Sequence, residues 1–414
     1  MRISPAASTC IFTVVALTLL GAVRNDDPIK RKPQPEPGSV IDADDYPDLQ
    51  AAIDAAPITG AVVQLGARTY EISKPLIIRH EDMHLRGVGT VTHIKNQNEN
   101  GEPALVIAPD TGFISKTEQK ERLWRVHVSS LRITGNPKSG HGIVVKRIQE
   151  FFLQGVTVSE HGGDGVHCED CYEDMRLSHC LITYNAGAGL YAKGNHDTIV
   201  SDTQFEENQD AVRYLDGFNL CMTGNNLDDH LRHGVVVENT YGSIISGNMI
   251  EECQGWAVIL DRDCYGIAVS SNVIAHEFTG GVDLRDAHSC TVSANAIPLC
   301  KEAGVRVGPQ SDRIAITGNS FGDSYIGKGK VLREGTTKIE QDKNQSAGVV
   351  LQETSDVTIT GNTFSGSMPK ALSVNGKVHR VVFSSNVIAG THSDHAKLQT
   401  SIVSANLFAQ ESTP

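Results

Sequence analysis

The sequence predicts an all-β fold in which short parallel strands are stacked in successive coils. Three features support this prediction: a motif that recurs at fixed spacing, repeats too short to hold a helix, and apolar residues that alternate with period 2. In the motif, an apolar residue and two mostly small or polar residues precede an asparagine. The motif ends at Asn136, Asn185, Asn208, Asn225, Asn248, Asn272, Asn295, Asn319, Asn362, Asn386 and Asn406.

The spacing of these asparagines indicates a solenoid. From Asn225 to Asn319, successive asparagines lie 23 or 24 residues apart, and a fixed period of this size is typical of stacked structural units. The unit at residues 267–289 contains only short alternating runs between Gly, Asn and Ser, which leaves no room for a helix of about 10–12 residues. Because parallel strands lie about 4.8 Å apart, each asparagine is expected to lie over the next and to share amide hydrogen bonds with it.

This pattern resembles the right-handed parallel β-helix superfamily that includes pectin and pectate lyases, polygalacturonases, alginate lyases and epimerases, and phage tailspikes. Residues 46–56, 62–65 and 67–72 are similar to the beginning of the fold in that superfamily. The resemblance therefore implies a right-handed parallel β-helix with a short N-terminal capping helix, since repeat arrays need a cap to cover their core. It does not imply one activity, because the superfamily hosts several chemistries.

The N-terminus predicts an exported protein with one repeat domain. Arg2 precedes an uncharged run at residues 10–23, which has the length of a signal-peptide core and is short for a membrane span. Residues 24–43 contain four prolines and are typical of a linker. We expect a signal peptide at 1–23, a linker at 24–43 and the β-helix at 44–414, in a secreted or periplasmic monomer without a stable membrane span. An uncleaved anchor is the alternative.

Charge narrows the class of partner. The net charge is −13, and the one basic run is Lys30, Arg31 and Lys32, which argues against nucleic acid as a partner. An acidic polysaccharide would also be repelled at long range. A site for a uronate must therefore rely on local Lys or Arg side chains or on a metal cation.

The cysteines are interpreted as structural. Eight of them follow the predicted signal peptide, and those in matching phase lie two coils apart, too far for a disulfide. They are expected to face inward as small hydrophobic residues. A zinc site that includes His167 and Cys168 is a weaker alternative, because Cys168 falls on the inward phase of its strand.

A candidate site follows from the strand after each glycine or alanine turn. Alternation directs the third and fifth residues of these segments outward, so two columns of side chains are expected along the stack. The first column is Val144, His167, Tyr191, Arg213, Val236, Ile259, Asp283 and Arg306. The second column is Lys146, Glu169, Lys193, Leu215, Glu238, Asp261, Arg285 and Gly308.

Much of this face is explained by cross-strand charge pairs, but Glu238 lies next to Asp261 on the adjacent coil. Two neighbouring carboxylates repel each other. Either Arg262 and Arg285 fold over to neutralise them, or a cation or a substrate group does.

Two reactions on a glycan are compatible with this face. In a lyase, Glu238, Asp261 and Asp283 would hold Ca²⁺ that neutralises a uronate carboxylate. Lys193 or Arg213 would act as the base and Tyr191 or His167 as the acid, while Glu169, Arg285 and Arg306 would bind substrate. In a hydrolase, two of the three carboxylates would flank the scissile bond.

The resemblance does not choose between these reactions. Of the polygalacturonase motifs, the chain has only Gly163-Asp164-Gly165 after His161 as a partial match, and the Asp-Pro-His-Glu motif of the alginate epimerases is missing. We expect a lyase that acts on a uronate-containing polysaccharide by β-elimination. A glycoside hydrolase and a non-catalytic carbohydrate-binding solenoid are the alternatives.

One interruption of the period predicts a functional loop. Asn319 and Asn362 are 43 residues apart, and the excess is a polar stretch with Lys328, Lys330, Arg333, Lys338 and Lys343. Long excursions from a scaffold often carry function, so this loop is expected to bring positive charge toward an anionic ligand. A tolerated surface insertion is the alternative.

Overall fold

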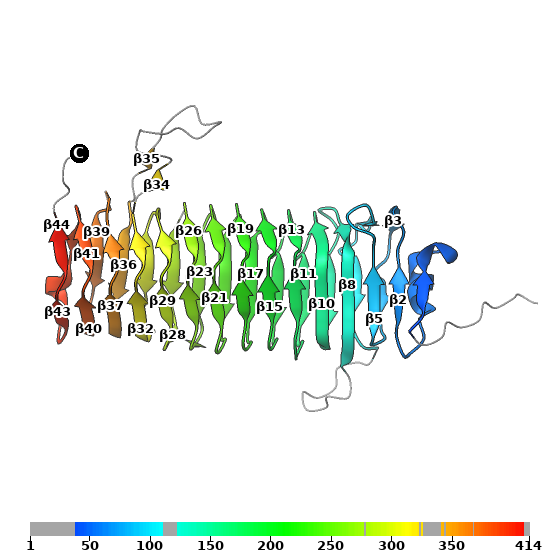
Figure 1. Cartoon of the computed structure of the whole chain (residues 1–414), viewed down its shortest axis with the longest axis horizontal. Helices are drawn as coiled ribbons and strands as arrows, with labels where there is room; N and C mark the ends of the chain where they lie inside the picture. Colours follow the sequence, from blue (N-terminus) through cyan, green and yellow to red (C-terminus); the bar gives the residue numbers. More distant parts are fainter. Residues whose placement is uncertain are drawn as a thin grey trace, which may run out of the picture. The chain divides into compact units, whose positions relative to one another are not determined.

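The computed structural model describes residues 38–110, 122–276, 279–322, 324–325, 341–342, 345–366 and 368–409. Within these ranges the chain forms coils of short parallel strands that lie side by side in a row (Figure 1). The predicted all-β parallel solenoid is confirmed. Residues 1–37, where the signal peptide and most of the linker are expected, lie outside the described residues.

One sheet contributes a single strand to each coil. It has 13 strands, all paired in parallel. They are β4 (Leu76–Ile78), β7 (Leu105–Ile107), β9 (Ile143–Lys146), β11 (Val166–Glu169), β14 (Leu190–Lys193), β17 (Asp210–Leu215), β20 (His233–Glu238), β23 (Trp256–Asp261), β27 (Gly280–Leu284), β31 (Ala303–Val307), β36 (Ala347–Gln352), β39 (Lys370–Asn375) and β42 (His392–Ser393).

The second sheet has 29 strands and covers the other sides of the coils. Most coils contribute two consecutive strands to it, and the long strands β8 and β10 pair with both rows. The strands are β1 (Val40–Asp42), β2 (Ala61–Gln64), β3 (Thr69–Ile72), β5 (Met83–Arg86), β6 (His93–Asn96), β8 (Leu123–Thr134), β10 (Ile148–Ser159), β12 (Arg176–Ser178), β13 (Leu181–Thr183), β15 (Ile199–Ser201), β16 (Gln204–Glu206), β18 (Cys221–Thr223), β19 (Asn226–Asp228), β21 (Ile244–Ser246), β22 (Met249–Glu251), β24 (Cys264–Tyr265), β25 (Ala268–Ser270), β26 (Val273–Ala275), β28 (Ala287–His288), β29 (Thr291–Ser293), β30 (Ala296–Ile297), β32 (Asp312–Thr317), β33 (Ser320–Phe321), β37 (Ser355–Thr360), β38 (Thr363–Phe364), β40 (His379–Ser384), β41 (Val387–Ala389), β43 (Ile402–Ser404) and β44 (Leu407–Ala409).

The core is a continuous column of apolar side chains inside the coils. The core forms because alternate side chains of each strand point inward. In β20, for example, Val235 and Val237 point inward and are fully buried. Larger side chains also stack between coils, as Phe321 does on Phe364 with ring centroids 4.9 Å apart. The eight cysteines are free thiols and most are buried, as expected for small hydrophobic residues.

Asparagines form the predicted ladder between the two rows of the 29-stranded sheet. From Asn225 to Asn406, the Nδ2 atom of each ladder asparagine donates to Oδ1 of the next over 2.9–3.1 Å. The residue before each ladder asparagine has a positive φ, and it is a glycine in four of these turns, at Gly224, Gly247, Gly318 and Gly361. Glycine adopts this conformation without steric cost, which explains the Gly-Asn pairs of the motif.

The interpretation of all eleven asparagines as one ladder is wrong. Asn185 donates to Asn208 over 2.9 Å, but these two residues precede strands of the 13-stranded sheet and form a second ladder. Its next member is His230, whose Nδ1 accepts the backbone N–H of Asn208 over 3.2 Å. The turns of both ladders have the same backbone conformation, since each places a residue with positive φ before a buried side-chain amide. This shared conformation explains why the same sequence motif occurs in both turns.

The described stack begins earlier than the predicted boundary at residue 44. β1 at Val40–Asp42 pairs in register with β2, since alternation buries Ile41 in the core. A helix α1 at Leu49–Asp54 follows the 3₁₀ turn Ala43–Asp45 and buries Leu49, Ala52 and Ile53. Asp48 caps α1 by accepting the N–H of Ala51 over 2.8 Å. The helix lies at the predicted place, and its role as a cap stays a prediction.

The predicted excursion leaves the stack between β33 and β36. Its described residues form an antiparallel pair of β34 (Ser324–Tyr325) and β35 (Gln341–Asp342), which stands clear of the row of coils (Figure 1). The lysines and the arginine that motivated the loop prediction lie outside the described residues. A 3₁₀ turn at His395–Lys397 lies near the C-terminal end. No helix in the described ranges is long and apolar enough to cross a bilayer.

Candidate functional site

The outer face of the 13-stranded sheet carries the two predicted columns in the predicted register. His167 pairs with Tyr191, Tyr191 with Arg213, and the pairing continues through Val236, Ile259 and Asp283 to Arg306. The second column runs from Lys146 through Glu169, Lys193, Leu215 and Glu238 to Asp261. This surface, formed by the two columns, is the outer face of the 13-stranded sheet.

A third column was missed by the sequence interpretation. It consists of the residue before each glycine or alanine that opens a strand, namely His141, Asp164, Ala188, Asp210, His233, Trp256, Gly280 and Ala303. The signal was visible, because His141 and Asp164 each stand between two glycines and are one period apart. They bring an imidazole and a carboxylate beside the first column.

At the N-terminal part of the outer face, His141, Asp164 and His167 form a compact cluster. The Oδ2 atom of Asp164 lies 3.2 Å from Nδ1 of His141 and 2.8 Å from Nδ1 of His167. The other nitrogen of His167, Nε2, lies 3.0 Å from Glu169, and Glu169 is paired with Lys146 over 2.8 Å. His167 is therefore held between two carboxylates.

Hydrogen bonds outweigh burial in the electrostatics of this cluster. Burial opposes the charge of Asp164, but the adjacent imidazoles of His141 and His167 and the backbone N–H of Ala188 hold the pKa of this carboxyl well below its usual range. Burial would lower the pKa of His167, yet its hydrogen bonds to Asp164 and Glu169 raise it overall. The pKa of Glu169 is lowered, because the hydrogen bonds to His167 and Lys146 outweigh its burial. The cluster thus stabilises ionised carboxylates around a positive imidazolium.

Tyr191 and Lys193 follow on the next coil and both point outward from β14. The ring of Tyr191 stacks on that of His167, with centroids 4.7 Å apart and 4° between the planes. The hydroxyl of Tyr191 and the ammonium of Lys193 have no hydrogen-bond or ion-pair partner among the residues that the structure describes. These two groups are free to meet a ligand.

Arg213 lies one coil further and is fixed by two carboxylates. Its guanidinium contacts Asp210 over 3.3 Å and Glu238 over 3.1 Å. Asp210 is fully buried and also binds Arg232. Burial opposes its charge, but the hydrogen bonds from Arg232 keep the pKa of Asp210 low. Arg213 therefore provides a positive charge held in one place.

In the C-terminal part of the outer face, several side chains are buried, although both columns were expected to face solvent. Val236, Trp256 and Ile259 are almost fully buried in a small apolar cluster outside the main core. Arg306 lies over the Trp256 ring, with its guanidinium carbon 4.4 Å from the ring centroid. The prediction that Asp283 is exposed is wrong, because Arg285 and Arg306 both bind its carboxylate over 2.6 Å and cover it completely.

The three carboxylates that were expected to hold calcium are each paired with arginine. Glu238 binds Arg262 over 3.0 Å, and Asp261 lies 3.6 Å from Arg285. Glu238, Asp261 and Asp283 do not form one of the metal-compatible groups found among the described residues. Of the two alternatives for the Glu238–Asp261 repulsion, the geometry favours neutralisation by arginine. Calcium binding stays a prediction.

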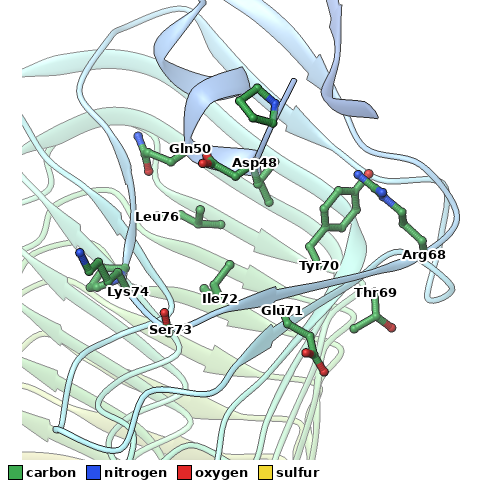
Figure 2. Close-up of a pocket in the computed structure, with 13 residues that line it drawn as sticks. Asp48, Gln50, Arg68, Thr69, Tyr70, Glu71, Ile72, Ser73, Lys74 and Leu76 are labelled. Carbon is green, nitrogen blue, oxygen red and sulfur yellow. The ribbon is translucent and has the colours of Figure 1, made fainter. Parts of the chain in front are cut away.

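A cavity of about 490 Å³ lies at the N-terminal end of the stack, between α1 and the strands β3 and β4. Figure 2 shows Leu76 and Ile72 in its interior, with Lys74 and Arg68 toward opposite sides. The amide of Gln50 is bound to the backbone of Ile77, and Arg68 is paired with Asp44. None of the site residues predicted from the sequence lines this cavity.

The family comparisons define the class. A family model described as right handed beta helix region matches residues 114–241. Together with the parallel coils, this match identifies the chain as a right-handed β-helix repeat protein. A second family model, described as periplasmic copper-binding protein (NosD), matches residues 188–331. The chain is similar to that family over this segment, which is about a third of its length. No curated protein matches it in sequence.

Solved structures with the same fold support this class. Tailspike protein 3 of bacteriophage CBA120 is 12% identical with a TM-score of 0.57, over 83% of this chain and 61% of the tailspike. A DFA-IIIase from Arthrobacter chlorophenolicus A6 is 13% identical with a TM-score of 0.53, over 89% and 99% of the two chains. The A-module of the mannuronan C-5 epimerase AlgE6 from Azotobacter vinelandii is 16% identical with a TM-score of 0.51, over 90% and 99%. At these identities the similarity extends to the fold alone.

Proposed function

We propose that the protein is exported and acts on a uronate-containing polysaccharide by β-elimination on the outer face. The observation that carries this proposal is the free pair on β14, Tyr191 and Lys193, between the fixed positive charge of Arg213 and the imidazole of His167. A polymer that lies along the stack would cross these residues on successive coils.

The residues match the needs of an elimination. The reaction removes the proton α to a carboxylate, and it needs positive charge at that carboxylate, a base, and an acid for the leaving oxygen. Arg213 cannot lose its proton, so it serves as the fixed charge that binds the uronate. Lys193 in its neutral form is the base. Tyr191, supported by the stacked ring of His167, is the acid.

A hydrolase fits the outer face less well. Glycoside hydrolysis needs one carboxylic acid that stays protonated, which requires a raised pKa. The carboxylates predicted for this role, Glu238, Asp261 and Asp283, are each paired with arginine. The carboxyl groups of Asp164, Glu169 and Asp210 have lowered pKa values, because hydrogen bonds from neighbouring side chains outweigh burial. Burial raises the pKa of Asp228 and Glu251, but these residues lie on β19 and β22 of the other sheet.

The comparisons support the substrate class and the export. One solved structure of similar fold belongs to an epimerase of mannuronan, and the family name NosD includes the word periplasmic. The same name includes copper binding. In the matched segment, the described group that could share a metal is Glu251, Glu252 and His276, with one imidazole. Copper sites favour several nitrogen or sulfur ligands, so we do not propose copper there.

The test is incubation with a panel of acidic glycans while ultraviolet absorbance is followed. Elimination forms a double bond conjugated to the carboxylate, which absorbs, whereas hydrolysis does not. Lys193→Met and Tyr191→Phe should each lower the rate by about 10²-fold or more. Tyr184→Phe, at an exposed tyrosine in the turn between β13 and β14, is the matched control and should leave the rate unchanged.

Two other results would replace the proposal. New reducing ends without absorbance would identify a hydrolase. Saturable glycan binding without any product would identify a non-catalytic carbohydrate-binding solenoid, for which the stack of coils suffices. Equal rates in wild type, Lys193→Met and Tyr191→Phe would mean that the residues of β14 do not catalyse the reaction.

A further inference from the structure

We propose that His141, Asp164 and His167 form a binding site for a divalent transition metal ion such as Zn²⁺. One ligand atom from each of the three side chains lies within 4.8 Å of those of the other two. Imidazole nitrogens and a carboxylate oxygen are ligands that zinc and its neighbours in the periodic table accept. The site follows from contacts between coils and is separate from the carboxylates considered for calcium.

The spacing of the ligand atoms suits a small ion. Atoms bound tetrahedrally at about 2.0–2.1 Å from a metal lie roughly 3.3 Å from one another. The Oδ2 atom of Asp164 lies 3.2 Å and 2.8 Å from the Nδ1 atoms of His141 and His167. The two rings belong to neighbouring coils, and their centroids are 4.4 Å apart. Small side-chain rotations therefore suffice to bring the three atoms around one ion.

The surroundings of the cluster hold its ligands in the required orientation. Metal-binding histidines usually donate their other ring N–H to a carboxylate, and Nε2 of His167 lies 3.0 Å from Glu169. Glu169 is held in turn by Lys146. The second oxygen of Asp164, Oδ1, accepts the backbone N–H of Ala188 over 2.8 Å, so Oδ2 is left for the ion.

Binding has a defined proton balance. His141 Nδ1 accepts the backbone N–H of Asp164 over 2.9 Å, so this nitrogen already carries a lone pair, and the ion would replace that hydrogen bond. The Nδ1 proton that His167 shares with Asp164 leaves to solvent. His167 keeps its Nε2 proton toward Glu169. No oxidation or other co-reactant is involved.

Three protein ligands leave at least one coordination position open. The side chain of His141 is 35% exposed, and those of Asp164 and His167 are 14% exposed, so the cluster is accessible from solvent. Tyr191 stacks on the far side of His167, so the cluster lies next to the free pair on β14. There the ion would attract an anionic sugar. This attraction rests on the proposed function, but the binding of the metal does not depend on it.

The experiment is a calorimetric titration of metal-free protein with Zn²⁺ near pH 7.5. One site per chain is expected in wild type. His141→Gln and His167→Gln should each weaken binding by at least about 10-fold. Two histidine controls should bind as wild type does: His276→Gln, in the group with Glu251 and Glu252, and His196→Gln, whose ring lies between those of Tyr172 and Phe218. Circular dichroism and the melting temperature establish that each variant is folded.

A second measurement does not depend on the variants. Co²⁺ in the wild-type site should give visible absorption bands of a four- or five-coordinate ion, and Zn²⁺ should remove them. The absence of heat with Zn²⁺, unchanged affinity in both His141→Gln and His167→Gln, or loss of the site in His276→Gln would each overturn the proposal. The glycan assay is a separate readout, so failure of β-elimination leaves the measured zinc affinity untouched.

Discussion

At the scale of single residues, the buried asparagines show how a repeat motif becomes a structural requirement. Asn272 donates from Nδ2 to Asn295 Oδ1 and to the carbonyl of Ile245, both over 3.0 Å. Its Oδ1 accepts the backbone N–H and the side-chain amide of Asn248. Every polar atom of this buried amide is therefore satisfied, and each link also satisfies the coil before it.

Asn272→Ala should lower the free energy of unfolding by about 1–3 kcal/mol, because it leaves the buried amide groups of its neighbours without partners. Chemical denaturation of both proteins measures the difference. Asn100→Ala, at an exposed asparagine, is the control and should change stability by less than about 0.5 kcal/mol. An equal, small effect in both variants would mean that water replaces the ladder bonds.

The burial of His230 leads us to expect that the free energy of unfolding depends on pH. It occupies an asparagine-like place in the second ladder, is fully buried, and its Nε2 has no partner in the described part of the chain. Burial lowers the pKa of His230 to about 4 from a usual value of 6.5. The unfolded chain therefore binds a proton that the folded chain excludes. Stability should fall as the pH decreases from about 6.5 toward 4.

His230→Asn should reduce this acid sensitivity, since asparagine keeps an acceptor for the N–H of Asn208 and does not titrate. The free energy of unfolding at pH 7 and pH 5 gives the slope for each protein. His392→Asn, at an exposed histidine, should keep the wild-type slope. Identical slopes in wild type and His230→Asn would show that other groups, such as His161, dominate the acid response.

At the scale of elements, the excursion between β33 and β36 is closed at its base by the stack itself. Asn319 donates to Asn362 over 3.0 Å, and β32 pairs in register with β37 beneath it. Phe321 also stacks on Phe364. The coils on both sides are therefore joined by the same contacts as elsewhere, although 43 residues separate the two asparagines.

Replacing residues 326–340 by a short Gly-Ser linker should leave the melting temperature nearly unchanged, because loop entropy changes by only about 0.6 kcal/mol for each doubling of length. The deletion removes Lys328, Lys330, Arg333 and Lys338, so binding of an acidic glycan should weaken. Calorimetry of folding and of binding separates the two effects. Unaltered binding would identify the excursion as a tolerated insertion.

At the scale of the whole molecule, contacts that repeat from coil to coil stabilise the fold. The candidate site is formed by side chains that differ from one coil to the next. Each coil contacts mainly its neighbours, so the apolar column and the ladders are sums of similar steps. The net charge is −13, and Lys146, Arg213, Arg285 and Arg306 on the outer face are each paired with a carboxylate. Within the described part of the chain, Lys193 is the cation of this face that is left to oppose the general repulsion of an anionic polymer.

The sequence by itself determined the solenoid, its period, the strands of the 13-stranded sheet and the register of the outer columns. These features follow from alternation and repeat length, which act on the backbone through neighbours in the chain. The tertiary structure decided how the side chains are partnered. Arg262 reaches back one coil to Glu238, Arg285 and Arg306 bury Asp283, and His141 meets His167 through Asp164. Long side chains choose among partners on adjacent coils according to packing and local charge, and no period in the sequence encodes that choice.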